Sequence, residues 1–327
     1  MYAMVLNKTG SPLTWTELPD RQPGSGQIRV KVGACGVCRT DLHVVDGELP
    51  DIRFPIIPGH EIVGRIDKIG SGVTNLAIGE RIGIPWLGHA CGVCPFCRSG
   101  RENLCDRPVF TGYTRNGGFA THAIADAQFV IKLGEVGSDV QLSPLLCAGL
   151  IGWRSLVIAG AGTRLGLYGF GASAHIVAQV AQWQNRSVFA FTRPGDSSGQ
   201  KFARLLGAVW AGGSNEIPAE QLDAAIIFAP DGSLIPLALK AINKGGRVVC
   251  AGIHMSDIPS FPYSLLWGER QLVSVANLTR QDGIDFFKLL PQIGIITHTT
   301  TYPLQQANEA LADLRAGRFE GAAVLVP

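Results

Sequence analysis

Residues 165–183 read LGLYGFGASAHIVAQVAQW, an apolar run, a glycine-rich turn and an amphipathic run. The first four residues are typical of a strand, and residues 172–184 predict a helix with apolar side chains on one side. The turn between them fits the pattern G-x-G-x-x-G/A, which lets a backbone approach a pyrophosphate at a helix amino terminus. This order predicts a dinucleotide-binding segment whose candidate contacts are Gly169, Phe170, Gly171, Ala172, Ser173 and Ala174.

Strand-like and helical segments continue to alternate beyond this turn. The expected segments are strands at 187–191, 224–228 and 247–251 and helices at 199–206 and 233–242. Such alternation predicts a parallel sheet covered by helices on both faces. We therefore expect an α/β fold with a Rossmann-type doubly wound parallel sheet over residues 153–290.

The first 150 residues have a different character, with short strands separated by glycine and proline. Residues 27–32 alternate polar and apolar side chains, and residues 61–69 are rich in β-branched ones. This pattern predicts an irregular β-barrel-like domain. A helix at 304–315 and a strand at 322–326 are expected to return to it, which gives a discontinuous domain over 1–152 and 291–327.

Four cysteines lie close together in the sequence with the spacing C-x2-C-x2-C-x7-C. They are Cys91, Cys94, Cys97 and Cys105. Four thiolates can wrap a tetrahedral ion and leave no open coordination position, so the motif predicts a structural zinc site. Thiolates also suit an iron–sulfur cluster, which stays the alternative.

A second set of candidate ligands combines two sulfurs and one imidazole nitrogen. Cys38 lies in GVCRTDLH, residues 36–43, and His60 in GHE, residues 59–61, while Cys147 follows much later. Three protein ligands leave a fourth position for water or substrate, the arrangement of a catalytic zinc.

Two carboxylates accompany these ligands. We expect Asp41 to orient His60 by a hydrogen bond to its second ring nitrogen. Glu61 is expected either to bind the metal transiently or to change its properties from outside the ligand shell. Zinc polarises a bound alcohol or carbonyl but has no redox chemistry of its own. The two electrons of such a reaction must therefore go to the dinucleotide.

The end of the second strand of the dinucleotide segment bears on which cofactor is bound. An acidic residue there usually binds a ribose 2′-hydroxyl, whereas a cation binds a 2′-phosphate. This chain has Thr192 in the acidic position and Arg193 next to it. We therefore expect NADP(H) to be preferred. Binding of NAD(H) stays open, because Asp196 follows three residues later.

Composition excludes several other classes of protein. The 327 residues carry a net charge of only +2, which favours neither nucleic acid nor an anionic membrane as a partner. The amino terminus has no secretory pattern and no charge-free run is long enough to span a bilayer, so a cytoplasmic location is expected. Of the eight cysteines, only Cys35 and Cys250 lie outside the metal motifs, and we expect both to be buried in strands.

With these motifs, the chain resembles the zinc-containing alcohol dehydrogenases of the medium-chain dehydrogenase/reductase superfamily, and among them the microbial primary alcohol dehydrogenases. The resemblance runs nearly from end to end and implies a GroES-like catalytic domain beside the Rossmann domain. It is carried by residues 36–43, 58–61, 86–87, 117–120 and 146–149, the four-cysteine motif and the nucleotide fingerprint.

The resemblance also implies roles for individual residues. Cys38, His60 and Cys147 would hold the catalytic zinc, and the four-cysteine motif the structural zinc, which makes two zinc ions per chain. The remaining implied roles are a proton relay from Thr40 through the cofactor ribose to His43, a pyrophosphate contact from Arg39, and a substrate pocket narrowed by Trp86. A hydroxyl and an imidazole suit such a relay on chemical grounds alone.

Three positions depart from the family pattern. Ala174 replaces the third fingerprint glycine, Ala322 stands where the family often has an arginine near the pyrophosphate, and Ile151 where it often has a threonine near the nicotinamide. These departures leave the metal ligands intact and bear on how tightly the cofactor is held.

The sequence thus predicts a zinc-dependent enzyme that reversibly oxidises alcohols, mainly primary ones, to aldehydes with NADP(H) or NAD(H). Its expected partners are small alcohols and aldehydes and copies of itself, in a dimer or a tetramer. A secondary-alcohol or polyol dehydrogenase stays a close alternative. A zinc-free enone or quinone reductase would have no use for the ligands Cys38, His60 and Cys147, and a non-enzymatic zinc or nucleotide-binding protein would not need the Thr40–His43 relay.

Overall fold

The computed structural model describes all of residues 1–327, which form two compact units. The first unit comprises Met1–Leu150, Asn277–Pro291 and Ile296–Pro327, and the second comprises Ile151–Ala276 and Gln292–Ile295. The returning segment begins earlier than the boundary near residue 291 that the sequence suggested. The difference arises from helix α8 (Arg280–Ile293), which packs on the first unit, where Phe286 approaches Gly149.

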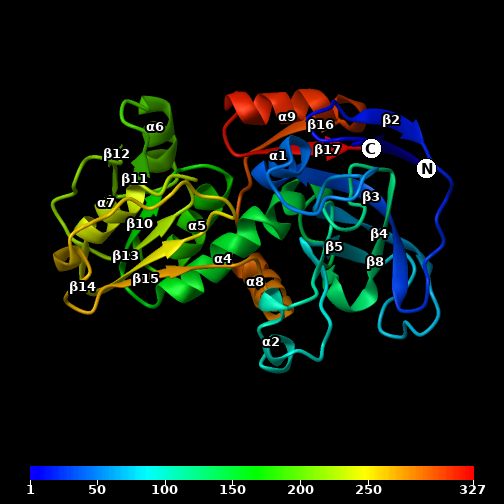
Figure 1. The fold of residues 1–327 in the computed structure, drawn as a ribbon, viewed down its shortest axis with the longest axis horizontal. Helices are drawn as coiled ribbons and strands as arrows, with labels where there is room; N and C mark the ends of the chain where they lie inside the picture. The colour runs from blue at the N-terminus through cyan, green and yellow to red at the C-terminus, as the bar shows by residue number, and fades with distance from the viewer. The chain divides into compact units, whose positions relative to one another are not determined.

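The second unit is built on a six-stranded sheet in the order β12-β11-β10-β13-β14-β15 (Figure 1). All neighbouring strands are parallel. The strands are β10 (Arg164–Tyr168), β11 (Ser187–Thr192), β12 (Trp210–Gly213), β13 (Leu222–Ile227), β14 (Ile242–Cys250) and β15 (Gln271–Ser274). The strand order reverses between β10 and β13, so the expected doubly wound α/β sheet is confirmed.

Helices connect these parallel strands. They are α5 (Ala172–Trp183), α6 (Ser197–Leu205) and α7 (Leu234–Ala241), preceded by α4 (Ala148–Ala159), with a 3-10 helix η4 (Tyr263–Leu265) before the last strand. The predicted strands and helices of this region therefore all form, with ends shifted by a few residues. Strands β12 and β15 were not predicted. The two glycines of β12 give no strand signal, although the strand pairs with β11 throughout.

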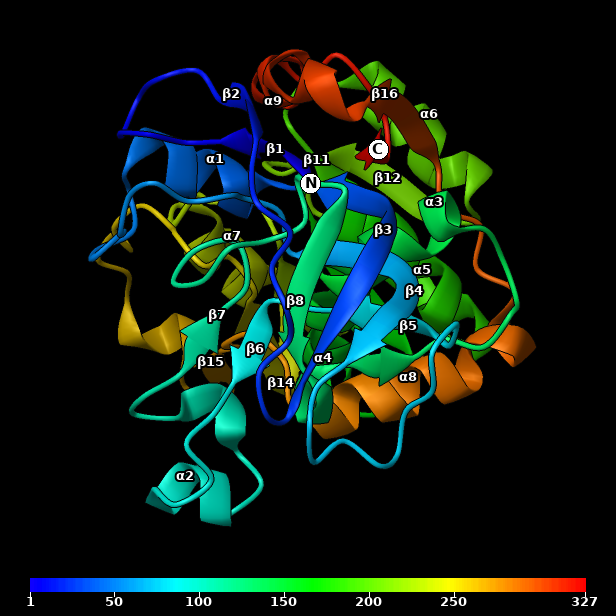
Figure 2. The same cartoon turned by 90° about the vertical axis from the view of Figure 1, so that its right-hand side faces the viewer.

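The first unit is organised around a seven-stranded sheet whose central strand is β3 (Gln27–Val37). Strands β3, β4, β5 and β8 lie side by side in Figure 2. The other strands of the unit are β1 (Tyr2–Val5), β2 (Thr14–Glu17), β4 (Glu61–Ile69), β5 (Arg81–Ile84), β6 (Leu87–His89), β7 (Val109–Phe110), β8 (His122–Asp126), β9 (Ile131–Lys132), β16 (Thr299–Pro303) and β17 (Ala322–Val326). Strand β17 pairs with β3 through Leu325 and Cys35, so the end of the chain completes this sheet.

Short helices join the strands of the first unit. They are α1 (Arg39–Asp46), α2 (Pro95–Arg98), η1 (Glu102–Leu104), η2 (Ala127–Phe129), α3 (Asp139–Leu142), η3 (Ser143–Leu146), η5 (Leu304–Gln306) and α9 (Ala307–Ala316). The predicted helix at 304–315 therefore forms as η5 followed by α9. Of these helices α1 bears most directly on function, because it starts and ends at candidate functional residues.

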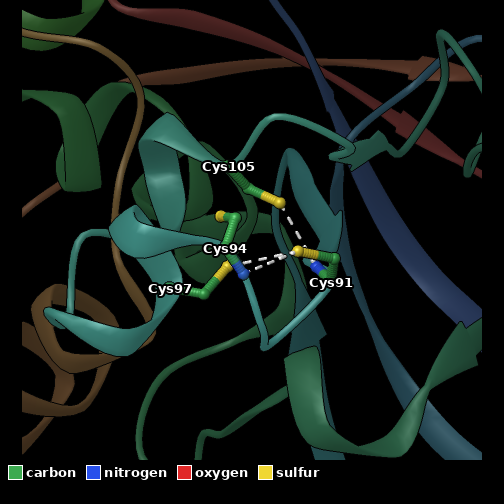
Figure 3. A group of neighbouring side chains, drawn as sticks. All are labelled: Cys91, Cys94, Cys97 and Cys105. Atoms are coloured by element: carbon green, nitrogen blue, oxygen red, sulfur yellow. Dashed lines mark hydrogen bonds between the residues drawn. The ribbon is translucent and has the colours of Figure 1, made fainter.

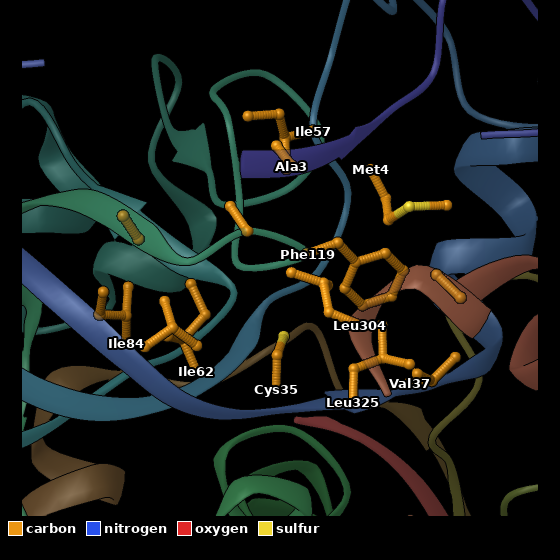
Figure 4. Packing of buried hydrophobic residues seen from close by; sticks show 14 of the residues in the cluster. Ala3, Met4, Cys35, Val37, Ile57, Ile62, Ile84, Phe119, Leu304 and Leu325 are labelled. Carbon is orange, nitrogen blue, oxygen red and sulfur yellow. The ribbon is translucent and has the colours of Figure 1, made fainter. Parts of the chain in front are cut away.

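The core of the first unit packs around the end of β3 (Figure 4). Cys35 has no exposed surface and lies among Ile62, Phe119 and Leu325. The prediction that this cysteine is a small buried hydrophobe in a strand is confirmed. Cys250 also lies in a strand, at the end of β14, but it is only partly buried against the core of the second unit.

No single helix of the chain has the length and apolarity needed to cross a membrane. One sharply bent pair, Asp139–Leu146 with Ala148–Ala159, meets the criterion by length and composition only.

Candidate metal centres and cofactor site

Helix α1 begins directly after a candidate metal ligand. Cys38 is its N-cap residue, with φ −126° and ψ 176°, and the Cys38 Sγ accepts a hydrogen bond from the Thr40 amide at 3.3 Å. The Asp41 carboxylate completes a capping box by accepting from the Cys38 amide at 2.9 Å. The geometry of the helix start thus fixes the direction of the Cys38 thiol.

His60 meets the same thiol from the start of β4. Its Nε2 lies 3.1 Å from the Cys38 Sγ and its Nδ1 lies 3.2 Å from the Asp41 Oδ1. The Gly59 amide donates to the same Asp41 oxygen at 3.1 Å. Since a carboxylate only accepts hydrogen bonds, the Nδ1 carries the hydrogen and the Nε2 is left for a cation. Gly59 itself has φ 95°, and an added Cβ would lie 2.4 Å from the Phe119 ring.

Two more donors close this group. Cys147 lies between η3 and α4, with its Sγ 3.9 Å from the Cys38 Sγ. Its ligand atom, those of Cys38 and His60, and a Glu61 carboxylate oxygen all lie within 4.8 Å of one another. The structure therefore brings together all four residues that the sequence proposed for this centre.

The electrostatics of the four donors fit a bound cation. The Cys147 contact and burial raise the pKa of the Cys38 thiol well above its usual value. Burial likewise raises the pKa of the Glu61 carboxyl. For His60, burial opposes the charged ring, but the Cys38 and Asp41 neighbours outweigh it and raise the pKa. For Cys38 and Glu61 the raised pKa expresses the cost of a buried negative charge without a counter-ion, and for His60 it expresses the attraction of the neighbouring anionic groups for a positive charge. A divalent ion among the donors would supply that positive charge.

The second cysteine group lies in residues 91–105 of the first unit, a lobe whose helix α2 projects from the sheet in Figure 2, and its side chains come together in Figure 3. The ligand atoms of Cys91, Cys94, Cys97 and Cys105 also lie within 4.8 Å of one another, and all four are free thiols. Helix α2 starts with Pro95 at its first position, and η1 ends beside Cys105. The local chain thus turns twice within fifteen residues to face four sulfurs inward.

Backbone amides favour the thiolate form in this lobe. Amides of Val93 and Cys94 hydrogen bond to the Cys91 sulfur and lower its pKa to about 6. Burial instead raises the pKa of Cys97 to about 12. Without a cation, a site of four cysteines is expected to hold some sulfurs as thiolates and others as neutral thiols. Binding of a cation would release the remaining protons.

The proposed relay residues lie on helix α1. Thr40 is partly exposed in its first turn, and His43 is 7% exposed near its end. The His43 Nδ1 is hydrogen bonded to the Glu48 carboxylate, a contact that the sequence did not predict. Arg39 lies exposed at the first helical position and makes no ion pair.

Trp86 lies beside the candidate metal centre. Its ring meets the His60 ring edge-on at 4.9 Å, and it stacks on Tyr113 at 5.6 Å and on Phe110 at 5.1 Å. The two stacking partners were not predicted. Their only sequence signal is an aromatic residue on either side of a Thr-Gly turn, 24 and 27 residues after Trp86.

The nucleotide fingerprint adopts the expected strand, turn and helix. Gly169 directly follows β10 with φ 86°, and an added Cβ would lie 3.0 Å from Ala229. Gly171 caps helix α5, and an added Cβ there would meet nothing within 4 Å. The space in front of Gly171 is therefore open to a group approaching the helix amino terminus, whereas Ala174 on the opposite side is fully buried.

The end of β11 has no free carboxylate. Thr192 is buried, and its single hydroxyl hydrogen can be donated to the Arg193 carbonyl at 3.2 Å or the Gly212 carbonyl at 3.4 Å. Asp196 is the N-cap of α6 and accepts from the Gly199 amide at 2.8 Å. Arg193 is exposed and has no ion-pair partner. Glu216, which follows β12, is engaged in the same way, because it accepts from the Gly213 amide at 2.6 Å. Both nearby carboxylates are thus occupied by backbone amides, and the cation is available.

The two remaining departures from the family pattern lie in regular structure. Ala322 opens β17 and is 4% exposed, so it offers no cation there. Ile151 lies in α4, where its carbonyl accepts from the Ser155 hydroxyl at 2.7 Å.

Comparison with known proteins agrees with this architecture. The model of the alcohol dehydrogenase GroES-like domain family matches residues 24–135. The chain is 48% identical over 313 residues to a probable alcohol dehydrogenase, AdhA, of Mycobacterium tuberculosis, covering 93% of this chain and 90% of that protein. It is 32% identical over 336 residues to an alcohol dehydrogenase of Geobacillus stearothermophilus, covering 99% of both.

Solved structures share the fold. An acetophenone reductase from Geotrichum candidum, in complex with NAD, superposes with a TM-score of 0.89 at 25% identity, covering 100% of this chain and 97% of that one. Sequence relatives over nearly the whole chain, the GroES-like match and the two cysteine-containing groups lead to one conclusion. This chain belongs to the zinc-type medium-chain alcohol dehydrogenase family.

Proposed function

We propose that this alcohol dehydrogenase holds two zinc ions per chain and oxidises primary alcohols to aldehydes, reversibly, with NADP(H) as its preferred cofactor. The observation that carries the zinc proposal is the buried group of Cys38, His60, Glu61 and Cys147, whose ligand atoms converge within 4.8 Å. A two-thiolate, one-imidazole set suits zinc and leaves room for substrate. Glu61 is a candidate fourth protein ligand when no substrate is bound, because its carboxylate oxygen lies in the same group.

A zinc ion held there would polarise the substrate oxygen and lower the pKa of a bound alcohol, and the nicotinamide would accept the hydride. The residues of the chain have the other tasks. Asp41 orients His60, and Trp86 limits the space beside the metal centre. Thr40 carries the substrate proton toward His43, which passes it to solvent. The turn at Gly169 and Gly171 binds the pyrophosphate at the amino terminus of α5.

The four-thiolate lobe is proposed to hold a structural zinc. Four sulfurs complete a tetrahedral shell, so this ion has no open position for substrate. The family membership favours zinc over an iron–sulfur cluster here. Metal analysis of the purified protein should find two zinc ions per chain and no iron.

The preference for NADP(H) is supported by the arrangement at the end of β11. Asp196 is engaged at the start of α6 and Arg193 is exposed without a partner. A charge-assisted hydrogen bond to a 2′-phosphate contributes about 1.5–3 kcal/mol, which corresponds to roughly a 10–100-fold difference in affinity.

The decisive experiment compares kcat/KM with NADPH and with NADH, using one aromatic and one short aliphatic aldehyde. We expect NADPH to be preferred and Arg193→Ala to remove that preference by raising the KM for NADPH about 10–100-fold. Lys240→Ala, which removes another exposed cation of the same unit on helix α7, is the matched control and should change neither value. A wild-type preference for NADH would contradict the cofactor proposal, and poor turnover of every primary alcohol would contradict the substrate proposal.

We further propose that the enzyme is a homo-oligomer, a dimer or a tetramer. Support comes from strand β15, which lies at the edge of the six-stranded sheet with open backbone hydrogen-bonding groups. The segment before it exposes Tyr263 by 71% and Trp267 by 63%. Light scattering after gel filtration tests this proposal, and a monomer at micromolar concentration would contradict it.

A further inference from the structure

Helix α1 ends in a hydrogen-bonded turn that leads back to His43. Gly47 has φ 75° and ψ 25°, and its amide donates to the Val44 carbonyl at 3.3 Å. The next amide, of Glu48, donates to the His43 carbonyl at 2.9 Å. This pair of bonds is a Schellman motif, which needs a left-handed residue such as glycine at position 47. The motif places residue 48 beside residue 43 whatever their side chains are.

The side chains at these two positions make an unusual contact for such a turn. The corresponding pair in a Schellman motif is frequently apolar. Here the His43 Nδ1 is hydrogen bonded to the Glu48 carboxylate. The His43 side chain is 8% exposed and the Glu48 side chain 46% exposed, so the pair leads from the interior to the surface. Because a carboxylate only accepts, Nδ1 carries the hydrogen and Nε2 of the neutral ring is the acceptor.

The segment that carries Glu48 is held by further contacts. Asp46, next to Gly47, pairs with Arg315 of helix α9 at 2.6 Å. The Tyr113 hydroxyl donates to the Pro50 carbonyl. The segment is thus anchored before and after Glu48.

The other charged groups on and around α1 have their own surroundings. Asp41 is engaged by Cys38, Gly59 and His60, and Arg39 is exposed at the opposite end of the helix. Asp46 of α1 and Arg315 of α9 form an ion pair, so their charges neutralise one another. Glu48 is therefore the carboxylate seen in contact with the His43 ring.

We propose that Glu48 is a positioning residue for proton transfer. It holds His43 as the Nδ1–H tautomer, so that Nε2 takes the proton that leaves the alcohol hydroxyl through Thr40. Its negative charge then stabilises the imidazolium. In balance, the alcohol O–H bond and the C–H bond on the same carbon break and the C=O bond forms. The proton passes through Thr40 and the cofactor ribose to Nε2, the hydride from the C–H bond goes to the oxidised cofactor, and the imidazolium releases its proton to solvent. This inference rests on the proposed relay from Thr40 to His43, and it adds the residue that sets the ring.

The first test reads the tautomer directly. Nitrogen-15 NMR of labelled, zinc-loaded protein at about pH 8.5, where an ordinary imidazole is neutral, distinguishes protonated from unprotonated ring nitrogens. His43→Gln identifies the His43 signals among the seven histidines. We expect a protonated Nδ1 and an unprotonated Nε2 in the wild type and in Glu48→Gln, whose amide oxygen still accepts. Glu48→Ala should move the hydrogen to Nε2, at least in part. A wild-type spectrum with a protonated Nε2, or an unchanged spectrum in Glu48→Ala, would overturn the proposal.

The second test reads the effect on turnover. We expect Glu48→Ala to lower kcat for alcohol oxidation by roughly tenfold with little change in KM, a part of the 10²–10⁴-fold that a general base contributes. Glu48→Gln should lose less, about threefold, because it keeps the tautomer and loses only the charge. Asp46→Asn is the matched control: it removes one negative charge at the same helix end, its amide oxygen can still accept from Arg315 and so keep the segment in place, and it should change neither the spectrum nor kcat.

The outcomes separate this inference from the proposed function. A tautomer that shifts in Glu48→Ala while kcat stays at the wild-type value would overturn a role in proton transfer. Wild-type protein that turns over no alcohol would refute the proposed function. The NMR comparison would still decide whether Glu48 sets the tautomer of His43. Thermal unfolding of each variant, compared with Asp46→Asn, identifies any loss that comes from folding alone.

Discussion

Asp41→Asn is the sharpest test of the proposed catalytic metal centre. The Asp41 carboxylate is 1% exposed and accepts three hydrogen bonds, from the Cys38 amide at 2.9 Å, the Gly59 amide at 3.1 Å and the His60 Nδ1 at 3.2 Å. An asparagine side chain has one acceptor oxygen, so either orientation of its amide turns an N–H toward at least one of these donors. The substitution therefore breaks one bond to a charged acceptor and leaves a buried donor unsatisfied.

The cost can be worked out from these contacts. A hydrogen bond to a charged group contributes about 1.5–3 kcal/mol, and an unsatisfied buried donor costs about 1–3 kcal/mol. Because the two estimates overlap, we expect a loss of about 2–4 kcal/mol in the free energy of unfolding. Loss of the carboxylate behind a ligand histidine should also weaken zinc binding at this centre by roughly 10–100-fold.

The assay is competition for zinc with a chelating dye, together with denaturant unfolding. Asp126→Asn is the matched control, because the Asp126 carboxylate also holds a histidine, lying 2.7 Å from the His89 Nδ1, but neither residue belongs to a group of candidate metal ligands. We expect the Asp41 variant to release one zinc ion early and to retain the other. Zinc binding and unfolding equal to those of Asp126→Asn would refute the reasoning.

Three further predictions concern other parts of the chain. Cys97→Ser should bind one zinc ion per chain and lose stability before it loses catalytic competence; full stability with that variant and unchanged metal content would contradict the assignment of the lobe. Asp223→Asn should lose about 2 kcal/mol at neutral pH, since Arg164 and backbone amides outweigh burial and lower the Asp223 pKa from 3.8 to about 2. This contribution is complete above about pH 4 and vanishes as the pH falls through about 2, so urea unfolding curves of variant and wild type should converge there. Trp86→Leu should shift kcat/KM toward a branched secondary alcohol, relative to ethanol, by roughly tenfold, and an unchanged ratio would show that Trp86 does not limit the pocket.

Much of the candidate site could be predicted from sequence because its signals are local. The four cysteines lie within fifteen residues, and the turn from Gly169 to Ala174 carries its own backbone requirement. Cys147 has no such local pattern, since it is 109 residues from Cys38, and only the resemblance to a family pointed to it firmly.

Other features depend on contacts that no sequence period records. Helix α8 contains Gly283 and Pro291, which weaken its helical signal, yet it packs against Ile131 and Gly149. The stack of Tyr113 on Trp86 joins residues from separate loops. The contact between His43 and Glu48 does have a sequence signal. A glycine one residue past a helix end predicts a Schellman motif, and that motif brings residues 43 and 48 together.

The short length of α1 has a consequence for protein engineering. Its start holds the Cys38 thiol and its end holds the His43–Glu48 pair, with a rise of about 1.5 Å per residue between them. A single inserted residue would rotate the second end by about 100° relative to the first. Chimaeras between related dehydrogenases should therefore exchange residues 38–48 as one cassette. A crossover inside the helix would combine a first turn from one enzyme with a last turn from another, and the two side-chain pairs would no longer have the relative orientation found in either parent.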